Sequence, residues 1–291
     1  QNGFKKSEVR CMAVRDYLKR SILRVAALLV PKEKVVADVS ELSGSDMLRG
    51  RCALITGGTS GIGYEMAKAF VKAGATVVVT GRNRERVNEA CRKLESEVGT
   101  EGAVYGMAWD NTKVKEMPDR FREALALAGD RKIDILVNNA GLVGGEISDC
   151  TEEDFDAIVD TNLKGTFFLS QLVARYFINN KIKGNILNIG SSSSLRPATS
   201  AYTMTKWAVY GLTRGLAKIL APHGITVNGL APGPTATPML MPGGIKDDIA
   251  FGNSLGRYEL PCEIANMAVF LVRGMGRAVI GDMVFMTGGS G

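Results

Sequence analysis

Hydrophobic and polar positions follow two alternating patterns from residue 51 onwards. Short apolar runs rich in β-branched residues predict strands at residues 53–55, 76–80, 104–109, 133–137, 185–189, 226–230 and 279–286. Between them, apolar residues at helical spacing predict helices at residues 64–73, 85–98, 113–128, 152–180, 201–220 and 263–273. Apolar strands that alternate with helices are typical of a parallel sheet covered on both faces. The sequence therefore predicts an α/β fold, a doubly wound parallel sheet of the Rossmann type in three layers.

The first 50 residues follow a different pattern. An apolar stripe on an otherwise basic segment predicts one amphipathic helix at residues 8–30, and residues 31–50 are interpreted as a linker to the main domain at residues 51–291. The longest apolar run in this segment, residues 25–30, is far too short to span a bilayer. Three roles stay open for the helix: packing on the main domain or another subunit, contact with an anionic membrane surface, or the remnant of an organelle-targeting segment.

Charge and cysteine content narrow the class of protein. The net charge is +6, and the first 30 residues carry seven Lys or Arg against two acidic residues, so the main domain is nearly balanced. We therefore expect no nucleic-acid partner. The 5 cysteines are odd in number and widely spaced, which indicates reduced thiols in the cytoplasm, or in an organelle matrix if the N-terminus is a targeting remnant. The single histidine, His223, has no cluster of metal ligands around it, and we expect no metal site.

A glycine-rich turn follows the first predicted strand. Residues 56–63 have the sequence TGGTSGIG and lead directly into the first predicted helix. Glycines let a backbone approach an anion closely, and a helix N-terminus offers unpaired N–H groups and the positive end of its dipole. We therefore expect a phosphate-binding turn made of Gly57, Thr59, Ser60, Gly61, Ile62 and Gly63. A tight turn without a ligand is the alternative that this motif alone leaves open.

Further candidate binding residues follow the other strands at the same edge of the sheet, where open α/β sheets bind ligands. Gly81 and Arg82 close the second strand, at the place where an acidic residue would hold the ribose hydroxyls of NAD. A cation there favours a phosphorylated ribose, so we expect NADP(H) rather than NAD(H); a solvated loop charge is the alternative interpretation of Arg82. The remaining candidates are Asp110 and Asn111 after the third strand, and Asn138, Ala140 and Gly141 after the fourth.

A tyrosine and a lysine four residues apart, Tyr202 and Lys206, begin the helix predicted at residues 201–220. This spacing puts phenol and ammonium on one helix face, where the cation would lower the pKa of the phenol. Such a tyrosine would exchange a proton with a carbonyl or alcohol oxygen. Tyr64 and Lys68 have the same spacing, but no hydroxyl donor precedes them and their helix is assigned to phosphate, so that pair is interpreted as surface and packing.

Two polar residues upstream complete the candidate chemistry. Ser191 follows the strand predicted at residues 185–189, and its hydroxyl would hold the substrate oxygen beside the phenol. Asn162 stands within the helix predicted at residues 152–180, an unfavourable place for asparagine. This misfit indicates a function for Asn162, such as opening the helix backbone to a water chain that leads to Lys206.

Taken together and in this order, the motifs closely resemble the short-chain dehydrogenase/reductase family, from about residue 51 to the C-terminus. The motifs are TGGTSGIG at 56–63, NNAG at 138–141, Asn162, the serine run at 191, YTMTK at 202–206 and APG at 231–233. The resemblance implies a Rossmann domain and hydride transfer between a nicotinamide cofactor and a ketone or secondary alcohol. It also implies that Ser191 polarises the carbonyl, Tyr202 is the acid/base and Asn162 relays protons through water.

The same resemblance assigns further roles and leaves others open. Lys206 would lower the phenol pKa and bind the nicotinamide ribose, and the loop facing the nicotinamide would contain Pro232, Gly233, Thr235 and Thr237. Family members are usually homo-oligomers, here a dimer or a tetramer. By overall similarity the chain looks like reductases of 3-oxoacyl thioesters or of sugar acids, such as gluconate 5-dehydrogenase-like enzymes, and steroid-like or other apolar ketones stay open as substrates. Residues 234–261 would form the segment that selects the small-molecule substrate.

The sequence also departs from the family pattern. The interval from Ser191 to Tyr202 is short, so Ser192 or Ser193 could replace Ser191, although the strand register favours Ser191. Thr287 stands where the family often has aspartate, and residues 1–50 have no counterpart. A non-catalytic subunit that keeps the fold and anchors through its N-terminal helix is the alternative function, and the complete Ser–Tyr–Lys–Asn set argues against it.

Overall fold

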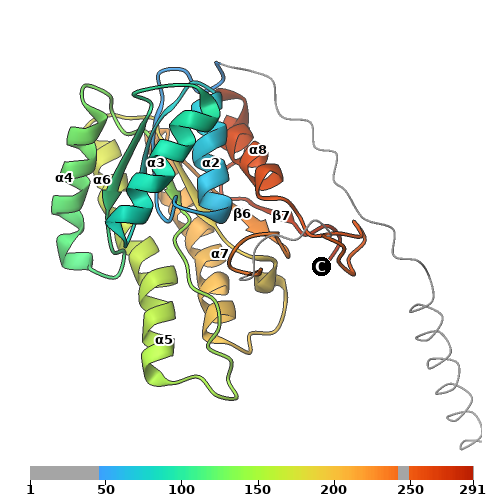
Figure 1. Ribbon diagram of the computed structural model, residues 1–291. Coiled ribbons are helices and arrows are strands. Elements are labelled where there is room, and N and C mark those ends of the chain that lie inside the picture. The colour runs from blue at the N-terminus through green and yellow to red at the C-terminus, as the bar shows by residue number, and fades with distance from the viewer. Residues whose placement is uncertain (1–45, 242–248, 291) are drawn as a thin grey trace, which may run out of the picture.

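The structure is a computed structural model that describes residues 46–241 and 249–290 (Figure 1). The amphipathic helix expected at residues 8–30 lies outside the described residues. Contacts with the folded domain begin before residue 51, because Leu48 is fully buried and its backbone N–H donates to the Ala73 carbonyl at 2.7 Å. The chain therefore packs on the folded domain from Leu48 onwards among the described residues.

A 7-stranded parallel sheet with the order β3-β2-β1-β4-β5-β6-β7 forms the centre of the domain, which confirms the predicted doubly wound fold. The strands are β1 (Cys52–Ile55), β2 (Thr76–Gly81), β3 (Val104–Ala108), β4 (Ile135–Asn138), β5 (Asn185–Ile189), β6 (Thr226–Pro232) and β7 (Met283–Met286). The strand order reverses between β1 and β4, which are hydrogen-bonded neighbours. A ligand crevice is expected outside the carboxyl ends of the strands at this point.

Helices cover both faces of the sheet (Figure 1). One hydrophobic cluster joins the sheet to α2 (Gly61–Lys72), α3 (Arg84–Val98) and α8 (Pro261–Val272). A second cluster on the other face joins it to α4 (Met117–Ala128), α6 (Thr166–Asn179) and α7 (Ala201–Leu220). The buried strands are apolar on both faces because each face packs against helices. The helix α5 (Glu152–Val159) extends beyond the sheet (Figure 1).

Three elements differ from the sequence prediction by more than shifts of up to three residues at their ends. The helix expected at residues 152–180 is divided into α5 and α6 by a π-helical segment, Asp160–Gly165. The helix expected at residues 113–128 begins with a 3-10 turn, Val114–Glu116, before α4. The last strand starts at Met283 rather than at residue 279, because the chain first forms the 3-10 turn Gly274–Ala278. None of these changes alters the order of the elements.

Among the described residues, no helix is both long and apolar enough to cross a membrane.

Arg51 stabilises the amino ends of the strands, on the side of the sheet away from the crevice. Its guanidinium forms an ion pair with Asp134 and donates to the Val272 carbonyl at 3.0 Å and to Asn185 at 2.7 Å. These bonds join the starts of β1, β4 and β5 to the end of α8. The polar residues predicted to bind a cofactor lie at the other ends of the strands, their carboxyl ends.

Candidate active site

A cleft with a volume of about 580 Å³ lies at the carboxyl ends of β1 to β6. The predicted residues that line it are Gly57, Thr59, Ser60, Gly61, Ile62, Arg82, Asp110, Asn111, Ala140, Gly141, Ser191, Tyr202, Lys206, Pro232, Gly233, Thr235 and Thr237. The structure thus brings the glycine-rich turn, the strand-end residues and the tyrosine–lysine pair to one hollow. Two predicted binding residues, Gly63 and Asn138, do not line it.

The glycine-rich turn has the backbone geometry that a bound phosphate needs. Gly57 and Gly61 have positive φ angles of 64° and 55°, which side chains rarely adopt. A Cβ on Gly57 would also lie 2.9 Å from the Cα of Ala140, so the turn is pressed against the end of β4. Ser60 precedes α2 without a side-chain cap, and the first turn of α2 contains no acidic residue. Its N–H groups are therefore left for an anion.

Gly63 and Asn138, which were expected to contact a cofactor, lie behind the cleft lining and make contacts within the domain. A Cβ on Gly63 would lie 2.4 Å from Nδ2 of Asn139 and 2.4 Å from the Gly57 carbonyl, so this glycine allows α2 to approach Asn139. The Asn138 side chain points toward α6 and β5, where it donates to Ser170 at 2.9 Å and to Asn188 at 2.8 Å. Successive residues at the end of a strand point to opposite sides, so only one of the two asparagines can face the turn.

Asn139 lines the cleft and was not among the candidates predicted from the sequence. Its Nδ2 donates to the Thr56 and Gly57 carbonyls, both at 3.0 Å, and its backbone N–H donates to Oγ1 of Thr56 at 3.0 Å. Asn139 therefore fastens the glycine-rich turn of β1 to the end of β4. The NNAG motif carried the signal, but spacing alone does not say which of its two asparagines faces the turn.

The outer end of the cleft is basic. Arg82 and Arg86 line it beside Asn83, and among the described residues neither arginine has an ion-pair partner. Asn83 caps α3 by accepting the Arg86 N–H at 2.8 Å. Gly81 closes β2, where a Cβ would lie 2.8 Å from Thr59, so this position is packed against the glycine-rich turn. Arg86 was not among the sequence candidates, although it lies one helical turn after Arg82.

The floor of the cleft carries Asp110 and Asn111 after β3. Asp110 accepts hydrogen bonds from the backbone N–H of Thr112 at 3.0 Å and from its hydroxyl at 2.8 Å, which fix the carboxylate in a turn. The Asn111 side chain is buried, and its Oδ1 has no hydrogen-bond partner among the described residues. A buried unpaired acceptor beside an open cleft is a group that a bound ligand would satisfy.

Asn162 lies in the π-helical segment and is 2% exposed. Its Oδ1 accepts the Leu142 N–H at 2.7 Å, and its Nδ2 donates to the Leu142 carbonyl at 2.8 Å and to Oγ1 of Thr205 at 3.1 Å. The Thr205 hydroxyl in turn donates to the Tyr202 carbonyl at 2.7 Å. The helix backbone is thus opened at Asn162, and its side chain joins the end of β4 to the first turn of α7. Asn162 itself does not line the cleft.

The first turn of α7 presents the tyrosine and the lysine to the cleft. Ser200 begins α7 by accepting the Thr203 N–H at 3.1 Å, which places Tyr202 and Lys206 on the inward face. The Lys206 ammonium is buried, donates to the Ile189 carbonyl at 2.8 Å and lies 5.5 Å from the centroid of the Tyr202 ring. Burial lowers the pKa of Lys206 to about 8.

Ser191 lies beside the phenol. Burial raises the pKa of Tyr202, and a hydrogen bond between Ser191 and the phenol opposes that rise. The Ser191 hydroxyl also donates to the Ser193 hydroxyl at 3.0 Å and accepts the Ser193 N–H at 3.1 Å. Ser191 is therefore held in place between its neighbour and Tyr202.

The direction of the tyrosine shift differs from the sequence expectation. The spacing to Lys206 predicts a phenol pKa that falls, and in the structure the pKa of Tyr202 rises. The physical reason is that burial disfavours the phenolate more strongly than the hydrogen bond from Ser191 stabilises it. The ammonium of Lys206 donates to the Ile189 carbonyl at 2.8 Å and lies over the Tyr202 ring, 5.5 Å from its centroid.

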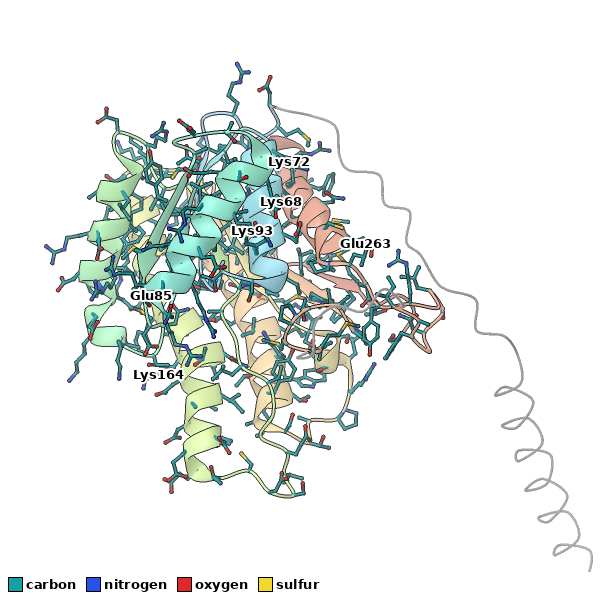
Figure 2. The ribbon with its side chains drawn as sticks, in the orientation of Figure 1. Lys68, Lys72, Glu85, Lys93, Lys164 and Glu263 are labelled. Atoms are coloured by element: carbon teal, nitrogen blue, oxygen red, sulfur yellow. The ribbon has the colours of Figure 1, made fainter. Side chains whose placement is uncertain are left out.

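The second tyrosine–lysine pair has a different environment, as the sequence predicted. Lys68 forms an ion pair with Glu97 of α3 at 2.8 Å, and Lys93 of α3 lies 5.3 Å from the centroid of the Tyr64 ring. Figure 2 shows Lys68 and Lys93 on the neighbouring helices α2 and α3. Burial raises the pKa of Tyr64, and neither Tyr64 nor Lys68 lines the cleft. This pair joins two helices.

The residues of the cleft fit a nicotinamide dinucleotide. The uncapped N-terminus of α2 suits a pyrophosphate, the unpaired Asn111 oxygen needs a donor, and the small residues Ala140 and Gly141 leave room along the end of β4. No group of His, Cys, Asp or Glu side chains that could hold a metal ion occurs in the part of the chain that the structure describes. Fold and cleft together define a dinucleotide-binding α/β protein with a tyrosine and a lysine beside the cofactor site.

Comparisons with known proteins give the family. The short chain dehydrogenase family model matches residues 51–247. A 3-oxoacyl-(acyl-carrier-protein) reductase of Thermotoga maritima is 32% identical over 247 residues, which cover 83% of this chain and 98% of that protein. Gluconate 5-dehydrogenase of Gluconobacter oxydans is 34% identical over 250 residues, which cover 83% of this chain and 95% of that protein. The chain belongs to the short-chain dehydrogenase/reductase family, and it is an oxidoreductase of that family.

Solved structures agree. A 3-ketoacyl-(acyl-carrier-protein) reductase of Brucella melitensis in complex with NADH matches with a TM-score of 0.73 and 32% identity, covering 83% of this chain and 98% of that chain. A short chain dehydrogenase of Burkholderia cenocepacia in complex with NADP matches with a TM-score of 0.71 and 31% identity, covering 84% of this chain and 99% of that chain. Relatives of this fold thus hold either nicotinamide dinucleotide.

Proposed function

We propose that this protein is an NADP(H)-preferring reductase that interconverts a ketone and a secondary alcohol. The observation that carries the proposal is the convergence of Tyr202, Ser191 and Lys206 on the cleft that also contains the glycine-rich turn and two arginines. The active set is complete, which argues against the alternative of a non-catalytic subunit.

The residues divide the chemistry between them. Ser191 orients the substrate carbonyl oxygen toward the phenol of Tyr202. Because burial raises the pKa of Tyr202, the phenol keeps its proton at neutral pH and can donate it to that oxygen. A bound nicotinamide supplies the hydride for reduction and, in its oxidised form, a positive charge. Lys206 holds the cofactor ribose from the floor of the cleft, and Asn162 keeps α7 in register through Thr205.

Arg82 and Arg86 support the preference for NADP(H). Two guanidinium groups without an ion-pair partner among the described residues face the outer end of the cleft, where the adenosine ribose would lie. A 2′-phosphate would form charge-assisted hydrogen bonds with them. An NAD-specific site would have a carboxylate at the end of β2 to bind the 2′-hydroxyl of the ribose. In this protein Gly81 occupies that place.

The substrate end of the cleft supports a carbonyl compound with an acidic or otherwise anionic end. Its wall is formed by Leu142, Val143, Met239 and Leu240, which are apolar, and by Arg196. Arg196 is held at the rim, because its guanidinium donates to the Ser290 carbonyl at 2.6 Å and its own carbonyl accepts Nε1 of Trp207 at 2.9 Å. Sugar acids and 3-oxoacyl compounds, the substrates named for some of the relatives, both combine a ketone or alcohol with a polar or anionic end.

Exposed aromatic residues on α5 to α7 support the expected homo-oligomer. Phe155, Phe167, Phe168 and Trp207 are each between 37% and 43% exposed on these helices. Large apolar side chains grouped on a surface are typical of an interface. We expect light scattering coupled to size exclusion to give a mass above the 31.1 kDa of one chain.

The proposed reaction is tested with Tyr202→Phe and with Tyr64→Phe as the matched control. We expect Tyr202→Phe to lose at least about a thousandfold in turnover of a ketone panel with NADPH, because the proton donor is removed. Its NADPH affinity, followed by fluorescence titration, should change little. Tyr64→Phe removes the same atom from the same spacing on α2 and should keep activity. Turnover retained by Tyr202→Phe would refute the assignment of Tyr202 as the proton donor. If the wild type fails to oxidise NADPH with every ketone of the panel, the result would favour the non-catalytic alternative.

A further inference from the structure

A buried carboxyl group lies directly behind the loop that faces the nicotinamide position. Glu259 is 4% exposed, and neither of its carboxyl oxygens has a hydrogen-bond partner among the described residues. Such a group is rare, because an unpaired buried carboxylate is strongly disfavoured. Nothing in the proposed reaction uses it, and it lies outside the lining of the cleft.

The carboxyl group is enclosed by glycines. A Cβ on Gly233 would lie 3.1 Å from both oxygens of Glu259 and 3.0 Å from the Cα of Thr287, and a Cβ on Gly288 would lie 2.7 Å from one of the oxygens. The side chain therefore fills the space between the end of β6 and the segment after β7. Because this space is closely packed, the carboxyl group can move only if the backbone at Gly233 or at Gly288 moves with it.

The backbone of Glu259 is fastened to the same loop. Its N–H donates to the Pro234 carbonyl at 2.9 Å, and its carbonyl accepts the Ala236 N–H at 2.9 Å. Thr235 and Thr237 of this loop line the cleft, and a Cβ on Gly61 would lie 3.4 Å from Thr237. A shift of Glu259 is thus transmitted within two residues to the side chains that would contact the cofactor, and from there to the glycine-rich turn.

The charged groups around Glu259 do not neutralise it. Arg257, on the preceding loop, donates to both carboxylate oxygens of Glu263 at 2.8 Å, so its charge is committed to that ion pair (Figure 2 shows Glu263 at the start of α8). Burial and Glu263 raise the pKa of Glu259 to about 7, and the nearby backbone N–H of Glu259 itself and the charge of Arg257 oppose the rise. The loop at 232–237 and the segment at 283–290 contribute no titratable side chain, and Cys262 of α8 is a neutral thiol whose pKa burial raises.

We propose that Glu259 is a positioning residue that must be neutral for the loop at 233–237 to hold the cofactor, so that cofactor binding takes up a proton at this carboxyl group. The neutral form fits between Gly233 and Gly288, whereas the carboxylate needs water or a donor and moves the loop to reach one. By reciprocity, whatever favours the neutral form of Glu259 favours the bound cofactor. The inference rests on the proposed function, since it takes the cofactor to be a nicotinamide dinucleotide.

The test compares the wild-type protein with two neutral variants, Glu259→Gln and Glu259→Met, and with Glu152→Gln, an exposed carboxyl on α5, as control. The NADPH dissociation constant is measured by fluorescence titration at about pH 5.5 and about pH 8.5, on either side of the pKa of Glu259 at about 7. We expect binding by the wild type and by Glu152→Gln to weaken about tenfold more over this interval than binding by either neutral variant, which corresponds to one pKa unit of coupling. The 2′-phosphate of NADPH and Lys206 titrate in all four proteins, so they cancel in the comparison.

Calorimetry supplies a second readout that a purely structural role would not change. Heats of NADPH binding at pH 7 in buffers of different ionisation enthalpy give the number of protons taken up. We expect the wild type to take up a larger fraction of a proton than both neutral variants. Equal proton uptake, or parallel pH profiles, would overturn the role of Glu259 while leaving the proposed function intact. An absence of NADPH binding by the wild type at both pH values would overturn both. If one neutral variant does not fold, the comparison of the wild type with the other one decides the matter.

Discussion

Replacement of Asn162 by alanine tests whether the opened helix depends on one side chain. Asn162 is 2% exposed and forms three hydrogen bonds, two with the backbone of Leu142 and one with the Thr205 hydroxyl, at 2.7 to 3.1 Å. In Asn162→Ala the N–H and the carbonyl of Leu142 lose their partners, and the Thr205 hydroxyl loses a donor. We therefore expect the variant to lose stability as well as activity.

The magnitude follows from those three bonds. A buried hydrogen bond contributes about 1 kcal/mol net, and leaving a buried partner unpaired costs about 1–3 kcal/mol. Leu142 is half-buried, so the lower end applies to its backbone groups, and the sum for Asn162→Ala is about 3–4 kcal/mol. The matched control is Asn180→Ala at the end of α6, where an exposed asparagine makes one hydrogen bond to the Tyr176 carbonyl at 2.9 Å. The control should cost less than about 0.5 kcal/mol.

Urea unfolding at neutral pH measures both free energies of unfolding, with the slope of the transition checked for two-state behaviour. Activity is then compared at a temperature at which both variants are folded. A loss below about 1 kcal/mol in Asn162→Ala would show that contacts other than those of Asn162 maintain the π-helical segment, which would refute the reasoning from its three hydrogen bonds. A stability loss with full activity would leave Asn162 as a purely structural residue.

Three further outcomes follow from the structure. Arg82→Ala combined with Arg86→Ala should weaken NADPH binding at least about tenfold and leave NADH binding nearly unchanged, as fluorescence titrations of both cofactors will show, because two charge-assisted contacts with the 2′-phosphate are lost. Gly63→Ala should lower the free energy of unfolding by about 2–3 kcal/mol in urea titrations, since its Cβ would displace Asn139 and break two of its hydrogen bonds. Stability should also depend on pH through Glu259, whose pKa rises from 4.5 to about 7 on folding. Between these two values the folded state binds a proton that the unfolded state does not. The contribution of Glu259 to the free energy of unfolding is therefore full below pH 4.5 and falls by about 3 kcal/mol as the pH rises through 7. Flat melting temperatures over that range would contradict the burial of this carboxyl group.

The order of strands and helices was predictable from the sequence because each buried strand is apolar on both faces and each helix has one apolar stripe. The spacing of the glycines in 56–63 and of Tyr202 and Lys206 also gave the position of the cleft. Both signals are local, since a turn and one helix face are each fixed by residues a few positions apart. The seven-stranded parallel sheet confirms the expected fold, and the structure places the turn, Tyr202 and Lys206 along one cleft.

Other features could not be obtained in this way because they depend on contacts between distant segments. Asn138 and Asn139 are equivalent as turn formers, and only the packing of β4 against β1 decides which one faces the glycine-rich turn. The sign of the Tyr202 shift depends on how deeply the phenol is buried, which the spacing to Lys206 does not report. Glu259 gave no sequence signal, because nothing in its neighbourhood along the chain shows that it is enclosed by Gly233 and Gly288.

Burial of ionisable groups around one cleft has a common consequence for the free protein. Burial keeps water from the Lys206 ammonium and lowers its pKa from 10.5 to about 8. At neutral pH the folded state therefore holds a buried charge that costs about 3 kcal/mol of the free energy of unfolding. This cost disappears as the pH rises from 8 to 10.5. Glu259, on the other side of the cleft, is driven toward its neutral form by the same lack of water. A ligand that gives the ammonium a further hydrogen-bond acceptor lowers the first penalty, whereas its binding requires a proton at Glu259. The rise in melting temperature caused by NADPH should consequently shrink more steeply with increasing pH in the wild type than in Glu259→Gln, which is neutral at every pH.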